Sequence, residues 1–415
     1  MNIFAIVVFS ALVVEFLVST AADVLNLKSL KQDIPKTLTG VYQPDEYRQS
    51  QDYTRTRTRF GFVTGSFGLL VILLFWFTGG FNSLDQIVRS WGFGSIVNGL
   101  AYLGILLIGY ELLTFPFGIY STFVIEERFG FNRTTPLIFF TDLIKGLVLT
   151  VMLGGPVLTG LLLLFEYGGD FAWLFCWLGI IIYTIIMQFV APVWLMPLFN
   201  KFTPMESGEL REAIQSYARS AGYAVKNIFV MDGSKRSTKA NAFFTGFGRT
   251  RRIALFDTLI DKHNLAELVA ILAHEIGHYK KKHLLQGMVL GVAHTGLIFY
   301  LFSVFLNSPG LYQAFYMEQS SLYTGFIFFG LLYAPVEMVL SSALNALSRR
   351  NEYQADRFAV ETTSEGGILE EALKKLSADN LSNLTPHPLY VALNYSHPPL
   401  LQRVEAIRRH KNRNG

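Results

Sequence analysis

The chain has 415 residues, of which 51% are hydrophobic and only 16% are charged. Soluble domains carry about 25% charged residues, so this composition excludes a disordered chain and argues against an ordinary soluble enzyme. The formal net charge is +4, and the single cysteine, Cys176, excludes an internal disulfide and a cysteine-based zinc or iron–sulfur site.

Seven apolar stretches are long enough to cross a bilayer, whose hydrocarbon core of about 30 Å needs about 20 apolar helical residues. They lie near residues 3–20, 61–79, 96–118, 146–165, 171–198, 284–306 and 322–346. The first has no basic residue before it and contains Glu15, so it is predicted to be a retained span rather than a signal peptide. The predicted regions are five helices with their loops (1–198), a polar segment (199–283), two further helices (284–346) and a polar C-terminal segment (347–415).

Lysine and arginine are distributed unevenly among the segments that connect these stretches. Alternate segments hold 34 of the 35 basic residues, and the segments between them hold one. Because basic loops stay in the cytoplasm, the N-terminus is predicted to lie outside and the C-terminus and both polar segments inside.

Four ionisable residues fall within the predicted spans: Glu15, Glu111, His294 and Glu337. A charge at membrane depth is costly unless it faces a partner or water. These residues therefore indicate a bundle that encloses water or, for Glu15 and Glu111, side chains near helix ends.

The first polar segment is predicted to be an α+β region. Its pattern indicates an amphipathic helix over Ser207–Arg219, short strands over Lys226–Met231 and Arg252–Phe256, and a second helix over Asn264–Lys282. Only twelve residues separate Glu267 from Lys280, too few to span a bilayer, so the second helix is predicted to lie at the inner membrane surface.

The second helix carries the sequence His274-Glu275-Ile276-Gly277-His278. Histidines four positions apart project from one helical face, so His274 and His278 can bind one zinc ion. Glu275 is displaced by about 100° toward the open coordination position, where a carboxylate can deprotonate zinc-bound water. The alternative is that both histidines are ordinary hydrogen-bonded side chains on a helix whose last lysines meet lipid headgroups. Four other histidines lack ligand spacing and are predicted to be solvated: His263, His283, His387 and His410.

A catalytic zinc needs a third protein ligand and a free position for water. After the seventh span, Glu352 and Asp356 share one helical face. Glu352 is the best third-ligand candidate, and Asp356 can accept the ring N–H of a ligating histidine and fix its tautomer. Read alone, an acidic pair beside two arginines is more typical of a solvated helix face.

Five ordered blocks of sequence point to a family: Pro197–Pro204, Gly233–Ser237 with Asn241–Ala242, Ala273–His278, Asn351–Asp356, and Ser396–Leu400 with Arg403. In these blocks the chain resembles the type I CAAX prenyl proteases, multi-spanning zinc metalloendopeptidases of gluzincin type. The resemblance implies a mainly α membrane protein, with seven transmembrane helices in a bundle around a water-filled chamber and an α+β zinc metalloprotease region at its cytoplasmic end.

The resemblance also implies a substrate and a binding strand. Members of the family cleave the peptide bond after the prenylated cysteine of a C-terminal CAAX tail, and some cleave other peptides. Asn241–Gly246 matches the strand along which the peptide lies, so Asn241, Ala242 and Phe243 are expected to contact the substrate. Such β-augmentation gives affinity through backbone pairing.

His397 and Arg403 carry over from the family as groups near the scissile carbonyl. A donor there would stabilise the oxyanion, an effect worth about 3 kcal/mol. Without the resemblance, His397 would only end a loop and Arg403 would lie on a solvated final helix.

The leading hypothesis is an integral-membrane zinc endopeptidase that removes the C-terminal tripeptide of prenylated proteins or cleaves related peptides. One Zn²⁺ per chain would bind His274, His278 and Glu352, with Glu275 as general base. The expected partners are the bilayer and a peptide or protein substrate, without nucleic acid, and the protein is predicted to be a monomer in a bacterial inner membrane or the endoplasmic reticulum.

Two alternatives remain. A quality-control metalloprotease of the heat-shock type is usually shorter and has fewer spans. A transporter or scaffold with structural zinc would need a closed four-ligand site, whereas the sequence offers three convincing ligands.

Overall fold

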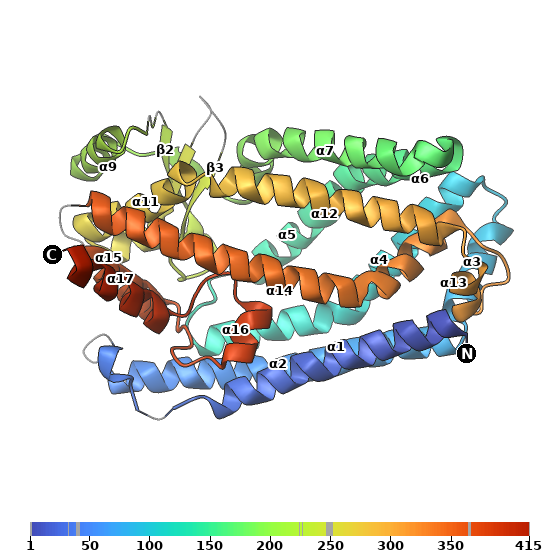
Figure 1. The fold of residues 1–415 in the computed structure, drawn as a ribbon, viewed down its shortest axis with the longest axis horizontal. Coiled ribbons are helices and arrows are strands. Elements are labelled where there is room, and N and C mark those ends of the chain that lie inside the picture. Colours follow the sequence, from blue (N-terminus) through green and yellow to red (C-terminus); the bar gives the residue numbers. More distant parts are fainter. Residues whose placement is uncertain are drawn as a thin grey trace.

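The predicted apolar stretches form long helices that run along the long axis of the molecule in the computed structural model (Figure 1). The structure describes residues 2–31, 33–38, 42–223, 225, 227–245, 252–363 and 367–414. Among them, seven helices are long and apolar enough to cross a membrane, which confirms the predicted mainly α membrane fold. They are α1 (Ile3–Lys28), α2 (Pro44–Phe77), α4 with η2 (Ser95–Tyr120, Ser121–Glu126), α5–η3–α6 (Pro136–Leu149, Thr150–Gly154, Gly155–Tyr167), α7–η5–α8 (Ala172–Val190, Ala191–Leu195, Met196–Phe199), α12 (His283–Leu306) and α14 (Leu322–Thr362).

Two of these helices extend far beyond their apolar stretches. Helix α2 begins at Pro44 and α14 continues to Thr362. Glu352 and Asp356 therefore lie on the same continuous helix that forms the seventh span. At the end of the bundle near the N-terminus, the short helices α3 (Gly80–Ser90) and α13 (Pro309–Ala314) connect the spans (Figure 1).

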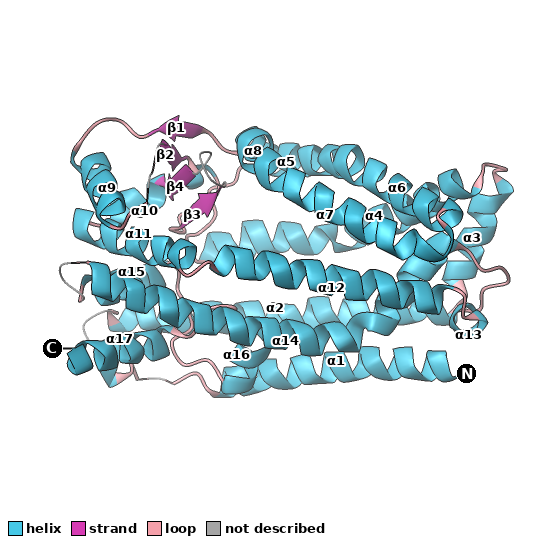
Figure 2. Cartoon of the chain, turned by 45° about the horizontal axis from the view of Figure 1, so that its top comes forward, coloured by secondary structure: helices cyan, strands magenta, loops and turns pink. Residues whose placement is uncertain are grey.

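The opposite end of the molecule holds a four-stranded sheet and most of the remaining helices (Figure 2). The strands are β1 (Phe202–Pro204), β2 (Asn227–Met231), β3 (Ala242–Thr245) and β4 (Arg252–Phe256), in the order β1-β2-β4-β3. Strand β2 pairs with β4 in parallel, and both edge strands pair antiparallel. The predicted strands coincide with β2 and β4, apart from Lys226, which lies outside the described residues.

Short helices surround the sheet and complete this end: α9 (Glu209–Ser220), α10 (Asp257–Lys262), α11 (Leu265–Lys280), α15 (Ile368–Asp379), α16 (Pro388–Asn394) and α17 (Leu400–Asn414). One apolar core joins all of these helices except α16, which packs against α1 and α14. The core includes the fully buried side chains Ile214, Ile253, Leu255, Leu369 and Val404. Helix α11 lies in the middle of this unit and packs against α9, α14 and α15.

Both ends of α11 are determined by local sequence. Asn264 accepts a hydrogen bond from the Glu267 N–H at 2.9 Å, and the Glu267 carboxylate accepts one from the Asn264 N–H at 3.1 Å. This reciprocal cap starts the helix. The helix ends at Lys280, and Lys282 has a left-handed backbone with φ of 60°, so the predicted helix to Lys282 is slightly too long.

The polar residues at membrane depth are partly paired. His294 Nε2 lies 3.0 Å from the Glu337 carboxylate, and Glu15 and Glu337 line a pocket of about 430 Å³ between α1 and α14. Glu111 is exposed. The pairing agrees with the rule that a charge at this depth needs a partner, while the water-filled chamber stays a prediction.

The two termini lie at opposite ends of the bundle, and both polar segments lie at the end of the C-terminus (Figure 1). The basic loop before α5 reaches the same end, because the Arg133 N–H donates to the Arg236 carbonyl at 3.0 Å. The segments rich in lysine and arginine therefore share one end of the molecule. Which side of the membrane this end faces stays a prediction.

Candidate metal centre

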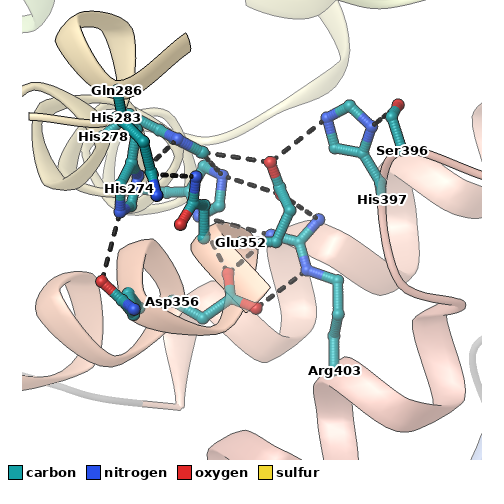
Figure 3. Close-up of polar contacts among 11 residues, drawn as sticks. His274, His278, His283, Gln286, Glu352, Asp356, Ser396, His397 and Arg403 are labelled. Atoms are coloured by element: carbon teal, nitrogen blue, oxygen red, sulfur yellow. Dashed lines mark hydrogen bonds and ion pairs between the residues drawn. The ribbon is translucent and has the colours of Figure 1, made fainter. Parts of the chain in front are cut away.

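Helices α11 and α14 bring together the three residues predicted to bind a metal (Figure 3). The Nε2 atoms of His274 and His278 lie 3.2 Å apart. The Glu352 carboxylate oxygens lie 3.4 Å from the first nitrogen and 3.2 Å from the second. Two nitrogens and one carboxylate thus converge on one point, although Glu352 is far away in the sequence.

A glycine allows this meeting. A Cβ atom on Gly277 would lie 3.0 Å from the Ala355 Cα and 3.1 Å from its carbonyl oxygen. Any larger residue would therefore push α11 away from α14, and with it the two histidines away from Glu352. The close packing of α11 on α14 therefore explains why a glycine occupies this position of the His-Glu-x-x-His motif.

The donor set fits zinc. Zn–N bonds of about 2.0–2.1 Å in a tetrahedron place ligand atoms about 3.3 Å apart, close to the three spacings here. Glu352 Oε2 is buried and has no hydrogen-bond partner among the described residues, although Arg403 Nη1 lies 3.6 Å away. A buried carboxylate oxygen without such a partner is costly unless a cation binds it. Three ligands leave the fourth position of a tetrahedron free.

Asp356 and Arg403 support the first histidine. Asp356 lies 2.8 Å from His274 Nδ1, and Arg403 donates to both carboxylate oxygens of Asp356 at 2.6 and 2.8 Å. A proton on His274 Nδ1 leaves Nε2 free to bind a metal. Burial lowers the pKa of His274, but the nearby carboxylates of Asp356 and Glu352 outweigh it and raise the pKa to about 9.

Arg403 is buried at the back of the site. Burial disfavours its charge, but Asp356, Glu352 and Glu275 together raise the pKa of Arg403 above its usual value. Two of its nitrogens are held by Asp356 and Nη1 lies 3.6 Å from Glu352. Arg403 therefore contacts both carboxylates, and the role near the scissile carbonyl that the resemblance implies for it stays a prediction.

His397 reaches the site from the loop between α16 and α17. Its Nε2 lies 3.4 Å from Glu352 Oε1, and its Nδ1 lies 2.9 Å from the Ser396 hydroxyl (Figure 3). The side chain is 66% exposed, so a substrate can approach it. Of the two residues predicted to lie near the scissile carbonyl, His397 has the exposed side chain and Arg403 the buried one.

Glu275, the predicted general base, lines a pocket of about 590 Å³ together with His278 and Phe243. Phe243 belongs to β3, which forms one edge of the sheet. Asn241, directly before β3, is exposed, and its side-chain oxygen accepts a hydrogen bond from the Ala242 N–H at 2.8 Å. Gly246, the predicted end of the substrate strand, lies outside the described residues. The pocket thus joins the predicted base, one ligand and the predicted substrate strand.

The prediction that the remaining histidines are solvated is wrong for His263 and His283. Both are buried. His263 Nδ1 lies 2.9 Å from the Glu267 carboxylate, and His283 Nδ1 lies 3.0 Å from His278 Nδ1. Because the helix is broken at Lys282, between α11 and α12, the helical period does not reveal the second contact. His387 caps α16, and His410 lies 2.9 Å from Glu361.

Comparisons with known proteins cover nearly the whole chain. Residues 23–201 match the family profile described as CAAX prenyl protease N-terminal, five membrane helices. Residues 204–411 match the profile of peptidase family M48. The two matches meet near the start of the polar segment that carries the two histidines.

Curated relatives match over most of their length. The chain is 36% identical to the CAAX prenyl protease 1 homolog of Arabidopsis thaliana, over 95% of each protein. It is 34% identical to CAAX prenyl protease 1 of Saccharomyces cerevisiae, over 90% of this chain and 88% of the yeast protein. The crystal structure of S. mikatae Ste24p superimposes with a TM-score of 0.91 at 32% identity, covering 98% of this chain and 99% of that one.

Proposed function

The chain belongs to peptidase family M48 and is a multi-pass membrane metalloprotease, and on this premise we propose that it is zinc-dependent and removes the C-terminal tripeptide of prenylated CAAX proteins. The observation that carries the proposal is the convergence of His274, His278 and Glu352 beside a pocket lined by Glu275 and the edge strand β3. One zinc ion per chain on these three residues leaves room for water.

When bound, zinc supplies a Lewis acid that acidifies water and polarises a carbonyl group. Glu275 takes a proton from the attacking water and passes it to the leaving amine, since its carboxylate lines the pocket without belonging to the ligand cluster. His397 donates a hydrogen bond to the oxygen of the attacked carbonyl. Arg403 keeps Asp356 in place, and Asp356 keeps His274 in the tautomer that binds metal.

Strand β3 binds the peptide in extended form. The Phe256 N–H donates to the Asn241 carbonyl at 3.1 Å, so Asn241 forms a hydrogen-bonded pair with β4. In an antiparallel pair of strands the next residue forms no hydrogen bond to the partner strand, so the N–H and carbonyl of Ala242 face away from β4. In the free protein the Ala242 N–H donates to the Asn241 side-chain oxygen. A carbonyl of the substrate accepts this hydrogen bond instead and displaces the Asn241 side chain. The released Asn241 amide is then free to contact the substrate.

Replacing Ala242 by proline tests this pairing. Proline removes an N–H on the free edge without breaking a β3–β4 hydrogen bond, a position where strands tolerate it. We expect the KM for a peptide to rise about tenfold, because the variant loses the free energy of one hydrogen bond to the substrate. The zinc content should stay unchanged. The matched control, Ala242→Gly, keeps the N–H and should keep the KM. An unchanged KM in Ala242→Pro would mean that the peptide does not pair with this edge.

The catalytic end faces the cytoplasm in this proposal. The alternate segments that hold 34 of the 35 basic residues support that orientation. A site at the boundary between cytoplasm and membrane suits a substrate whose peptide is polar and whose prenyl group is apolar. The bilayer is thus a partner of the reaction as well as the location of the enzyme.

Incubation of the detergent-purified protein with a farnesylated C-terminal peptide tests the function. We expect release of the terminal tripeptide, loss of cleavage with a zinc chelator and recovery with added Zn²⁺. The same peptide without the farnesyl group and an unstructured casein serve as comparison substrates. Preference for casein would favour a quality-control protease, and cleavage that survives complete removal of metal would refute the mechanism.

A further inference from the structure

His283 and Gln354 lie behind the second zinc ligand in an arrangement that the proposed mechanism does not use. His283 Nδ1 lies 3.0 Å from His278 Nδ1, on the side of that ring away from the metal position. His283 Nε2 lies 3.3 Å from the Gln354 side-chain oxygen. His283 is buried, 9% exposed, at the first turn of α12 (Figure 3).

With His283 neutral and the Gln354 oxygen facing it, the three side chains have one consistent proton arrangement. The Gln354 oxygen can only accept, so His283 carries its proton on Nε2 and presents an unprotonated Nδ1. That nitrogen accepts from His278 Nδ1–H, which leaves the lone pair of His278 Nε2 free. This nitrogen is the one that lies 3.2 Å from both His274 Nε2 and Glu352.

The backbone between the two histidines is shaped for this contact. In a continuous helix, residues five apart differ by about 500°, so His283 would project about 140° away from His278. Lys282 adopts φ of 60°, which a non-glycine residue rarely does, and this conformation ends α11 and starts α12. The break turns the His283 ring back onto His278.

We propose that His283 and Gln354 are positioning residues that hold His278 in the tautomer and ring orientation that bind zinc. His274 receives the same support from Asp356, whereas His278 receives it from a neutral imidazole and amide pair. The two ligands are therefore held independently, one through α14 and α17 and the other through α12 and α14. The inference rests on the metal site of the proposed function but not on its substrate.

Zinc affinity, measured by competition with a chelator, tests the proposal with two His283 variants. His283→Leu removes the acceptor and should weaken zinc binding about 10–100-fold. His283→Asn keeps an acceptor near the Nδ1 position and should restore affinity to within about threefold of the unchanged protein. The absorption spectrum of the Co²⁺ form should shift in His283→Leu and return in His283→Asn.

A control removes a remote histidine. A second variant tests the chain of hydrogen bonds from Gln354 through His283 to His278, which we call the relay. His410→Asn, at the pair with Glu361, should leave zinc affinity unchanged. Gln354→Met should weaken zinc binding less than His283→Leu, and adding it to His283→Leu should cost nothing more, since the relay is already broken. Equal melting temperatures of the metal-free variants would show that folding is intact.

The outcomes separate the inference from the proposed function. If His283→Leu binds zinc as tightly as the unchanged protein, or if His283→Asn loses as much affinity as His283→Leu, the positioning role is wrong. If the losses of zinc affinity in His283→Leu and Gln354→Met multiply in the double variant, the two residues act separately and the relay is wrong. If the unchanged protein binds no zinc, the proposed function itself fails.

Discussion

Replacing Glu275 by glutamine is expected to lower the rate of peptide cleavage by about 10²–10⁴-fold while zinc stays bound. Glu275 lines the pocket beside His278 but does not belong to the cluster of three ligand atoms. An amide matches the carboxylate in size and cannot accept the proton of the attacking water. The measurement is the single-turnover rate on a farnesylated peptide, with the zinc content of the same sample.

The control for Glu275→Gln is a carboxylate that the mechanism does not use. Glu212 is exposed on α9, and Glu212→Gln changes the net charge by the same amount. It should leave both rate and zinc content unchanged. Full activity in Glu275→Gln would remove the general base from the mechanism, and loss of zinc would mean that the residue acts on the metal site instead.

Much of the membrane fold and part of the site follow from local sequence. The bilayer imposes a length of about 20 apolar residues, so each span is visible as a stretch of sequence. The helical period places His274 and His278 on one face whatever surrounds them. Glu352 could be proposed because a catalytic zinc needs a third ligand, and because Glu352 and Asp356 share one helical face on the same predicted side of the membrane as the two histidines.

The tertiary contacts could not be predicted in the same way. The approach of α11 to α14 depends on Gly277 meeting the Ala355 backbone, which no periodicity reveals. The contact of His283 with His278 depends on a left-handed Lys282. Strands β1 and β3 have three and four residues, too few for alternation to stand out.

Arg403 shows how burial changes the interpretation of a residue. Its place in a family block indicated a group at the scissile carbonyl, but two of its nitrogens are bound to Asp356. A guanidinium beside two buried carboxylates is needed first to balance their charge. Through Asp356, Arg403 can influence the orientation of His274, in addition to any contact with a substrate.

Replacing Glu352 by glutamine should have the largest effect on metal binding. Glu352 is 2% exposed and supplies the only negative charge among the three ligands of the described cluster. Loss of a positioning residue costs about 10–100-fold in metal affinity, so loss of a direct anionic ligand should cost more than about 100-fold. Cleavage should disappear with the metal, and the neighbouring Arg403 keeps its pair with Asp356, which should preserve the fold.

Thermal unfolding with and without zinc provides a readout that does not depend on substrate. A ligand at 100 times its Kd stabilises the folded state by about 2.7 kcal/mol, so the unchanged protein should melt at a higher temperature when zinc is added. Glu352→Gln should lose this increase, whereas Glu361→Gln, at an exposed position on the same helix, should keep it. If Glu352→Gln is still stabilised by zinc to the same extent, the third ligand lies elsewhere. The proximity of α14 to the two histidines would then serve packing alone.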